Sequence, residues 1–218
     1  MKKDIKTKIA LFPMPVLMVA TYDEKGNVDV MPAAWGMIND DDKITLCLDE
    51  EHKTTKNIRA VKAFTVSLAD KEHMAATDFF GIVSGNKMAD KFERSGCHAV
   101  KSQHVNAPII EEFPVVMECE LLEIVETENL HAIVGKIVNA QADEKILDRK
   151  GKVSFAKFKA IAFNQFNNTY HAVGKSIGKA WHEGAVINFG VEEMDEALNS
   201  YLQNKINNES KDKTKLES

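Results

Sequence analysis

Residues 31–58 read MPAAWGMINDDDKITLCLDEEHKTTKNI, and the predicted fold depends mainly on this segment. A hydrophobic segment that contains Trp35 turns back, through Asn39 and three aspartates at 40–42, into a second strand-like segment at 43–49. A basic, Thr-rich loop follows and opens a helix near Thr54. This order of elements can hold a flat, apolar ring at one end and a phosphate at the other, because a helix start attracts anions.

Short apolar segments surround this stretch and recur at near-regular spacing. Val28–Ile38 is predicted to be one strand, and Pro32 within it is typical of an edge or bulged strand near a site. The other predicted strands are Val16–Tyr22, Lys43–Asp49, Ala63–Leu68, Pro114–Glu126 and Leu130–Gln141, and Lys159–Phe166 is either a strand or the start of a Phe-rich loop. Helices are inserted between these strands rather than alternating with them, which favours a mainly β fold with an antiparallel barrel.

The clearest hairpin joins Pro114–Glu126 to Leu130–Gln141. In its first strand Met117, Cys119 and Leu121 share one face, after which Leu122 and Ile124 occupy the other. Because side chains alternate strictly along a regular strand, this change of face predicts a β-bulge.

The helical segments are marked by their caps and apolar spacing. The predicted helices are one capped by Thr54 and running to about Val61, one from Asp70 to about Phe80, and a short one over 87–94 that ends at Gly96. Residues 101–114 contain two prolines and little periodicity, so they are predicted to form a long loop.

The length of 218 residues suits one domain, expected over residues 1–190. Val191–Ile206 has the apolar stripe of an amphipathic helix that packs on the body or on a dimer partner. Residues 207–218 are polar and charged, so we expect a disordered tail.

Composition excludes several classes of protein. The net charge of −5, without a basic stripe, argues against a nucleic-acid partner. The apolar segment Ile9–Tyr22 contains two prolines and is too short to span a bilayer, so neither a membrane span nor a secretory signal is expected. The three cysteines, Cys47, Cys97 and Cys119, show no C-x-x-C spacing and are expected to be reduced thiols of a cytoplasmic protein.

Two apparent motifs do not meet their chemical requirements. Gly174–Ala180 resembles a phosphate-binding P-loop, but it has three residues between its glycines and lacks the Ser/Thr that would bind magnesium. Cys97, His98 and His104 have no metal-site spacing, so no metal is expected. No G-x-G-x-x-G follows a strand, which argues against a Rossmann domain.

Three segments are candidate ligand contacts, and each could instead have a purely structural role. In Asp49–Asn57 a lysine, hydroxyl groups and a helix start lie together, and this combination suits a phosphate. A capped helix with solvated lysines would have the same composition. Gly81–Lys87 could bring backbone amides close to a ligand or could simply join two helices. Trp35, beside small residues, either borders a slot for a planar ring or packs in the core.

Taken in order, these segments resemble the flavin reductase-like, or flavoredoxin, family. The resemblance covers about residues 10–182, and no single segment of it is specific. The matching segments are Asn27–Trp35, Thr54–Ile58, Phe64–Leu68, Gly81–Lys87, Asp90–Phe92, Asn106–Ile110, Glu118–Cys119, Gly135–Val138 and Phe166–Tyr170. The family has an FMN-binding split barrel, a Greek-key antiparallel β-barrel that is usually a homodimer with the flavin near the subunit interface.

The resemblance implies a set of cofactor contacts. The isoalloxazine would be flanked by Met31, Pro32, Ala33, Ala34 and Trp35, with Cys47, Leu48 and Asp49 along the ring or ribityl chain. The phosphate side would be held by His52, Lys53, Thr54 and Asn57, and the pocket closed by Val83, Ser84, Gly85 and Lys91.

The chain also departs from the family pattern. Lys53 stands where relatives often carry an Arg. An arginine can bind a phosphate with two parallel hydrogen bonds, whereas the ammonium group of a lysine acts as a single point charge. The Gly-Asp-His of many flavin reductases is replaced by Glu128-Asn-Leu-His131, which makes His131 a weak candidate for a nicotinamide contact.

The resemblance leaves three functions open. The first is an oxidoreductase that moves electrons from NADH or NADPH through bound FMN to a free flavin, a redox partner protein or a small acceptor. The second is a flavoredoxin-type electron carrier with tightly bound FMN and no direct reaction with NAD(P)H. The third is a β-barrel binding module for another ligand. No catalytic residue is assigned, because hydride transfer to a flavin requires no side-chain acid or base.

Overall fold

The protein is described here by a computed structural model, which covers residues 1–5, 11–184 and 187. Its strands are β1 (Met14–Pro15), β2 (Leu17–Tyr22), β3 (Val28–Ala33), β4 (Gly36–Asp40), β5 (Lys43–Leu46), β6 (Ala63–Leu68), β7 (Ala99–Lys101), β8 (Pro108–Ile110), β9 (Val115–Thr127), β10 (Leu130–Ala142), β11 (Ile161–Asn164) and β12 (Thr169–Ala172). Its helices are α1 (Lys53–Val61), α2 (Met74–Ile82), α3 (Lys91–Ser95), α4 (Phe155–Phe158) and the 3₁₀ turn η1 (Glu144–Ile146).

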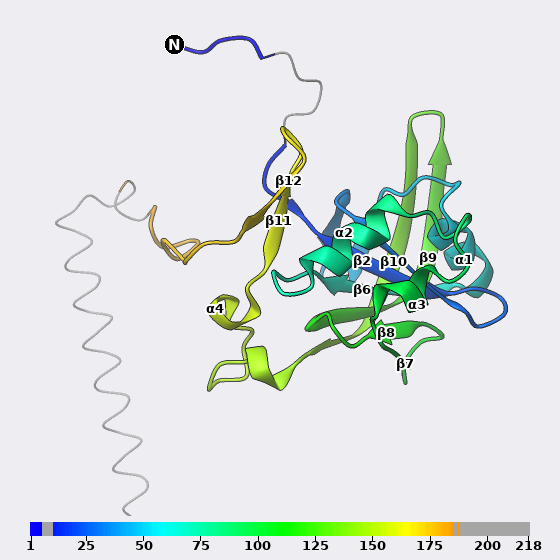
Figure 1. Cartoon of the computed structure of the whole chain (residues 1–218). Helices are drawn as coiled ribbons and strands as arrows, with labels where there is room; N and C mark the ends of the chain where they lie inside the picture. The colour runs from blue at the N-terminus through cyan, green and yellow to red at the C-terminus, as the bar shows by residue number, and fades with distance from the viewer. Residues whose placement is uncertain (6–10, 185–186, 188–218) are drawn as a thin grey trace, which may run out of the picture. The chain divides into compact units, whose positions relative to one another are not determined.

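The main sheet has seven strands in the order β3-β2-β6-β9-β10-β5-β4, and every neighbouring pair is antiparallel. Figure 1 labels its strands β2, β6, β9 and β10. Its two edge strands, β3 and β4, are joined by only Ala34 and Trp35, so the sheet must curl to bring the end of β3 next to the start of β4, although the two strands are not hydrogen-bonded to each other. At the junction a Cβ on Gly36 would lie 2.6 Å from Leu17 Cδ1 and 2.7 Å from Leu46 Cδ2. This closure confirms the predicted antiparallel barrel.

The prediction of one strand over Val28–Ile38 was wrong. The segment forms β3 and β4, which lie at opposite edges of the sheet. The two-residue link of Ala34 and Trp35 takes the chain from one edge to the other, a connection that hydrophobic patterning does not reveal. The edge position predicted from Pro32 is confirmed, since proline donates no ladder hydrogen bond.

Two hydrophobic clusters pack on opposite faces of β2. Leu17 and Val19 belong to the cluster inside the barrel, together with Phe64, Ile58 and others. The alternate residues Met18 and Ala20 belong to a second cluster that includes Phe80 and Ile110. Because both faces of β2 are buried, its sequence is a continuous apolar run rather than an alternating one.

The β9–β10 hairpin carries the predicted bulge. Its pairing shifts between Val134 and Gly135, where Leu122 is left without an opposite residue, and again between Ile137 and Asn139. The first shift coincides with the change of face at Leu122, which confirms the sequence prediction.

The helices α1, α2 and α3 all pack beside β3. The short helix α3 ends at Gly96 in the left-handed conformation, as predicted. The second helix begins at Met74 rather than Asp70, because the Asp70 carboxylate instead accepts hydrogen bonds from His73 N and Nδ1. The expected loop over 101–114 contains the strand β8, which pairs with β7 at the start of the loop to form a short hairpin.

The ambiguous segment 159–166 contains β11, which forms a three-stranded sheet with β1 and β12. The compact unit that holds all these strands spans Met1–Val173, whereas the expected domain ended at residue 190; a second unit begins at Gly174. The predicted helix Val191–Ile206 and the tail 207–218 lie outside the described residues. None of the helices described is long and apolar enough to cross a membrane.

Candidate ligand site

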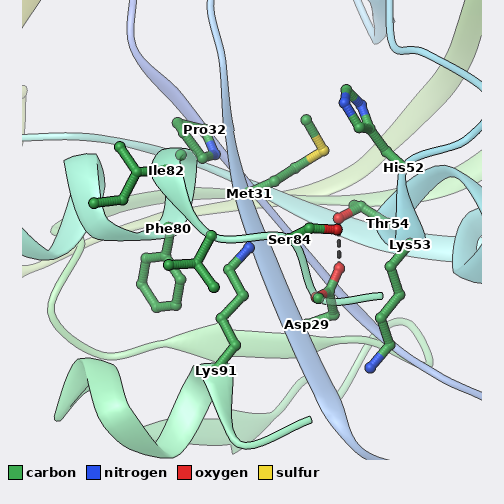
Figure 2. A pocket seen from close by; sticks show the side chains of 13 residues that line it. Asp29, Met31, Pro32, His52, Lys53, Thr54, Phe80, Ile82, Ser84 and Lys91 are labelled. Atoms are coloured by element: carbon green, nitrogen blue, oxygen red, sulfur yellow. Dashed lines mark hydrogen bonds between the residues drawn. The ribbon is translucent and has the colours of Figure 1, made fainter. Parts of the chain in front are cut away.

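A cavity of about 370 Å³ opens beside the edge strand β3, where α1, α2 and α3 converge (Figure 2). This volume falls in the usual range for small-molecule pockets, about 300–1,000 Å³. The lining residues come from β3, from the start of α1, from the end of α2 and the loop after it, and from α3; they are Asp29, Met31, Pro32, His52, Lys53, Thr54, Phe80, Gly81, Ile82, Val83, Ser84, Gly85 and Lys91.

The start of α1 is open to an anion. His52 is its N-cap residue, but no side chain caps the helix, and its first turn contains no acidic residue. The predicted cap at Thr54 was therefore wrong, because its hydroxyl points to β3 and donates to Asp29 Oδ2 at 2.6 Å. Uncapped backbone N–H groups at a helix start carry a partial positive charge and bind phosphates well.

Lys91 supplies a buried cation on the opposite side of the cavity (Figure 2). The residue is 5 % exposed, its Nζ donates to Val30 O at 2.8 Å, and the same nitrogen lies 5.7 Å from the centre of the Phe80 ring. Burial lowers the pKa of Lys91, whereas the charge of Asp29 raises it. An anion in the cavity would further favour the charged form of this amine.

The loop after α2 approaches the cavity closely because of Gly85. A Cβ at this position would lie 2.2 Å from Asp29 Oδ1 and 3.0 Å from Lys53 Cδ, so any larger residue would displace the side chains of the cavity. Asn86 ties the same loop to the entry of α1, since its Nδ2 donates to Glu51 O at 2.8 Å.

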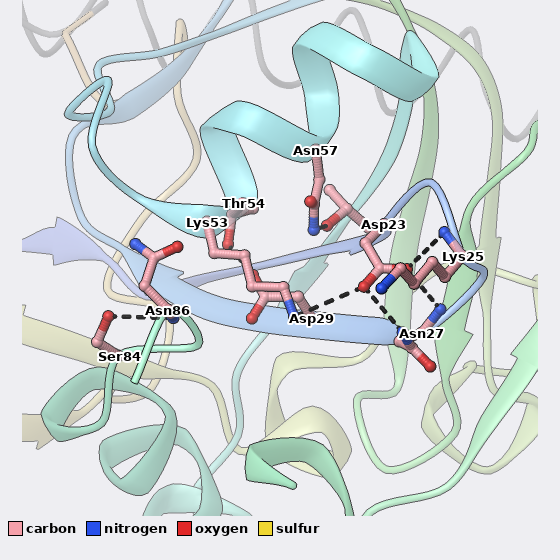
Figure 3. Close-up of polar contacts among 10 residues, drawn as sticks. Asp23, Lys25, Asn27, Asp29, Lys53, Thr54, Asn57, Ser84 and Asn86 are labelled. Carbon is pink, nitrogen blue, oxygen red and sulfur yellow. Dashed lines mark hydrogen bonds and ion pairs between the residues drawn. The ribbon is translucent and has the colours of Figure 1, made fainter. Parts of the chain in front are cut away.

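Lys53 lies at the outer side of the site. Its Nζ is 3.8 Å from Asp23 Oδ2, and Asp23 also accepts hydrogen bonds from its own turn, at Lys25 N and Asn27 N (Figure 3). Asp23 therefore holds Lys53 in an ion pair at the rim of the cavity, while Lys91 is more deeply buried.

The structure brings nine of the predicted contact residues to this one cavity: Met31, Pro32, His52, Lys53, Thr54, Val83, Ser84, Gly85 and Lys91. Sequence reasoning missed two lining residues, Asp29 and Phe80, whereas Gly81 and Ile82 lie in the candidate segment Gly81–Lys87 without having been named as individual contacts. Asp29 had a usable signal, since residues two apart on a strand share a face and Met31 was already a candidate. Phe80 directly precedes the predicted segment Gly81–Lys87.

The remaining predicted contacts do not line this cavity. Ala33 and Leu48 are buried in the barrel, Trp35 is 56 % exposed, and Cys47 is half-buried with its N–H bonded to Trp35 O. Asp49 is exposed, and Asn57 Nδ2 donates to Thr21 Oγ1 within the protein. Ala34 lines a smaller apolar depression with Ala33, Pro32, Phe163 and Tyr170, and Pro32 also borders the main cavity.

His131 is also absent from the residues that line the cavity. It lies opposite Glu126 in the β9–β10 hairpin, and the ligand atoms of His131, Glu126 and Glu50 are within 4.8 Å of one another. All three are exposed, and Glu126 already pairs with Arg59. The group is thus a charged surface cluster outside the cavity.

Comparisons with known proteins agree with this architecture. Residues 9–159 match the family described as the flavin reductase like domain. The flavoredoxin of Desulfovibrio vulgaris (Miyazaki F) is 31 % identical, with a TM-score of 0.80 over 84 % of this chain and 100 % of that one. The flavoredoxin of Methanosarcina acetivorans is 25 % identical, with a TM-score of 0.77 over 86 % of this chain and 99 % of that one.

An uncharacterized protein of Aeropyrum pernix is 27 % identical over 128 residues, which are 58 % of this chain and about half, 48 %, of that protein. The family match extends over most of the compact unit, from before β1 to the end of α4. The chain therefore belongs to the flavin reductase-like family of flavin-binding split-barrel proteins.

Proposed function

We propose that the protein binds FMN with its phosphate in the cavity beside β3. The observation that carries this proposal is the pairing of an uncapped helix start with the buried cation of Lys91 in one cavity. A phosphate near neutral pH carries close to two negative charges, and backbone amides together with an ammonium group suit it. The residues present therefore fit the group that the family implies.

The isoalloxazine ring would lie along Met31–Trp35, outside the phosphate cavity. Pro32 connects the two regions, because it borders both the cavity and the apolar depression of Ala34, Phe163 and Tyr170. This surface offers apolar contacts for a flat ring, and Trp35 remains exposed beside it. We also propose that Cys47, Leu48 and Asp49, which directly follow strand β5, contact the flavin on the side of its ring.

The protein would act as an oxidoreductase that moves electrons from NADH or NADPH to a flavin, a partner protein or a small acceptor. Bound FMN supplies the hydride and electron chemistry, and the protein supplies binding and orientation. In this chain Lys91 and the amides of α1 would anchor the phosphate, while Gly85 would let the loop close on it. None of the residues that line the cavity is assigned as a catalytic acid or base.

A second candidate is an electron carrier that keeps FMN bound and exchanges electrons only with partner proteins. The similarity to two flavoredoxins favours it, as does the position of His131 away from the cavity.

We further propose that the protein forms a homodimer through β4. Met37 is 68 % and Ile38 is 52 % exposed on this edge strand, and an exposed apolar edge is a ready site for association. The three cysteines are free thiols, which supports a reducing compartment such as the cytoplasm.

Visible spectroscopy separates these functions. The protein is purified, supplied with FMN, and mixed anaerobically with NADH or NADPH. Bleaching within seconds supports the reductase, whereas a yellow protein that is reduced only by a redox partner protein supports the carrier. If the protein is colourless once unbound FMN has been removed, it has not retained FMN. That result would contradict both functions and favour a binding module for another ligand.

A further inference from the structure

The cavity contains an acidic side chain whose presence phosphate binding does not explain. Asp29 is only 3 % exposed, and its carboxylate lies in the same space as Lys91 and the start of α1 (Figure 2). Its one hydrogen bond among the described residues comes from Thr54 Oγ1. None of the ion pairs found in the described part of the chain includes Asp29, and Lys53 pairs with Asp23 instead.

The charge of Asp29 acts on Lys91, whose pKa it raises, but no direct ion pair in the described part of the chain replaces the hydration that this buried carboxylate loses, and that loss destabilises the folded state. The shape of the site does not require this charge. Asparagine has nearly the same size, and its amide oxygen could still accept the hydrogen bond of Thr54. What aspartate adds at position 29 is therefore the negative charge itself.

This charge acts against the ligand that the rest of the cavity attracts. Like charges in a poorly hydrated cavity repel more strongly than in water, and the phosphate of FMN is close to a dianion. Lys91 and the start of α1 attract the phosphate, while Asp29 opposes it from β3. Groups that are buried at a binding site mainly affect the dissociation rate.

We propose that Asp29 sets the residence time of FMN, so that the flavin exchanges with solution instead of remaining permanently bound. This inference rests on the proposed phosphate site. It assigns Asp29 as a residue that discriminates between ligands by their charge: the carboxylate weakens binding of the phosphorylated flavin and leaves the ring and ribityl chain unaffected.

The test compares Asp29→Asn with the unaltered protein, using FMN and riboflavin. Riboflavin has the same ring and ribityl chain but no phosphate. Flavin fluorescence quenching gives the dissociation constants, and stopped-flow displacement gives the dissociation rates. We expect Asp29→Asn to lower both values about tenfold for FMN, equivalent to about one charge–charge contact, and to change those for riboflavin less than about twofold.

Asp23→Asn is the matched control, because it removes the same charge from a partly exposed residue that also faces Lys53. There solvent screens the charge, so FMN binding should change less than about twofold. Asp29→Ser, which keeps a hydroxyl partner for Thr54, serves as a second variant in case Asp29→Asn folds poorly.

Three results would overturn the inference. If Asp29→Asn binds FMN no more tightly than the unaltered protein, Asp29 does not oppose the phosphate. If FMN and riboflavin gain equally, the effect is one of shape rather than charge. If the unaltered protein binds neither flavin, the proposed function itself fails, an outcome that is distinct from the other two.

Discussion

At the scale of single residues, the site depends on Lys91 as the buried cation. Replacing it by methionine keeps the apolar stem but removes the charge and the hydrogen bond to Val30 O. We expect Lys91→Met to raise the dissociation constant for FMN by roughly 10- to 100-fold, since hydrogen bonds to charged groups contribute about 1.5–3 kcal/mol, and to change riboflavin binding much less.

Fluorescence titration measures both constants. Lys87→Met is the control, because Lys87 is an exposed cation in the neighbouring loop. We expect this substitution to leave both dissociation constants unchanged. Equal losses for the two flavins in Lys91→Met would show that the phosphate does not contact this amine.

Gly85 makes the second prediction at this scale. Because a methyl group there would meet Asp29 Oδ1 and Lys53 Cδ, Gly85→Ala should push both side chains away from their positions. We expect FMN affinity to fall at least about tenfold, while the free energy of unfolding falls by about 1–3 kcal/mol.

Isothermal calorimetry and urea denaturation measure these two effects. Gly174→Ala is the control, since nothing lies within 4 Å of a Cβ built there. Unchanged FMN binding by Gly85→Ala would mean that the loop does not contribute to the site.

At the scale of elements, the buried carboxylate of Glu118 joins β9 to its neighbours. It accepts hydrogen bonds from Ser102 Oγ, from Asn139 Nδ2 at 2.6 Å and from Gln141 Nε2 at 2.5 Å. Burial by itself would raise the pKa of Glu118, but these hydrogen bonds outweigh it and hold the pKa below its usual value.

This shift gives a pH dependence of stability with a defined sign. A carboxyl group with a lowered pKa in the folded state stabilises the protein above its unfolded pKa, about 4.3, and loses that contribution as pH falls through the folded pKa. Glu118→Gln should therefore lower the free energy of unfolding near pH 7 by about 2–4 kcal/mol and flatten its decline at acid pH.

Urea denaturation between pH 7 and pH 3 measures this dependence, with Glu120→Gln, an exposed neighbour on the same strand, as the control. An identical pH profile in Glu118→Gln and the unaltered protein would contradict the assignment.

The sequence predicted individual elements better than their arrangement. The β9–β10 hairpin and its bulge followed from local alternation at Leu122, and the end of α3 followed from Gly96. The separation of β3 from β4 did not, because it depends on how a curled sheet closes around Gly36. The role of Thr54 was also misjudged, since its hydroxyl found Asp29, a partner 25 residues away in the sequence.

At the scale of the whole molecule, the exposed edge of β4 predicts a dimer. Met37→Glu should produce a monomer, because a charge in an apolar interface leaves a desolvated carboxylate without a partner. Light scattering after size-exclusion chromatography measures the mass, and Val100→Glu, at a half-exposed position on β7, is the control. A dimer that survives Met37→Glu would place the interface elsewhere.

A crystal structure of the protein grown with FMN would locate the phosphate itself. We expect phosphate density in the cavity beside β3, within hydrogen-bond distance of Lys91 Nζ and of the amides that begin α1. A phosphate bound outside this cavity, with Lys91 still bonded only to Val30, would contradict it.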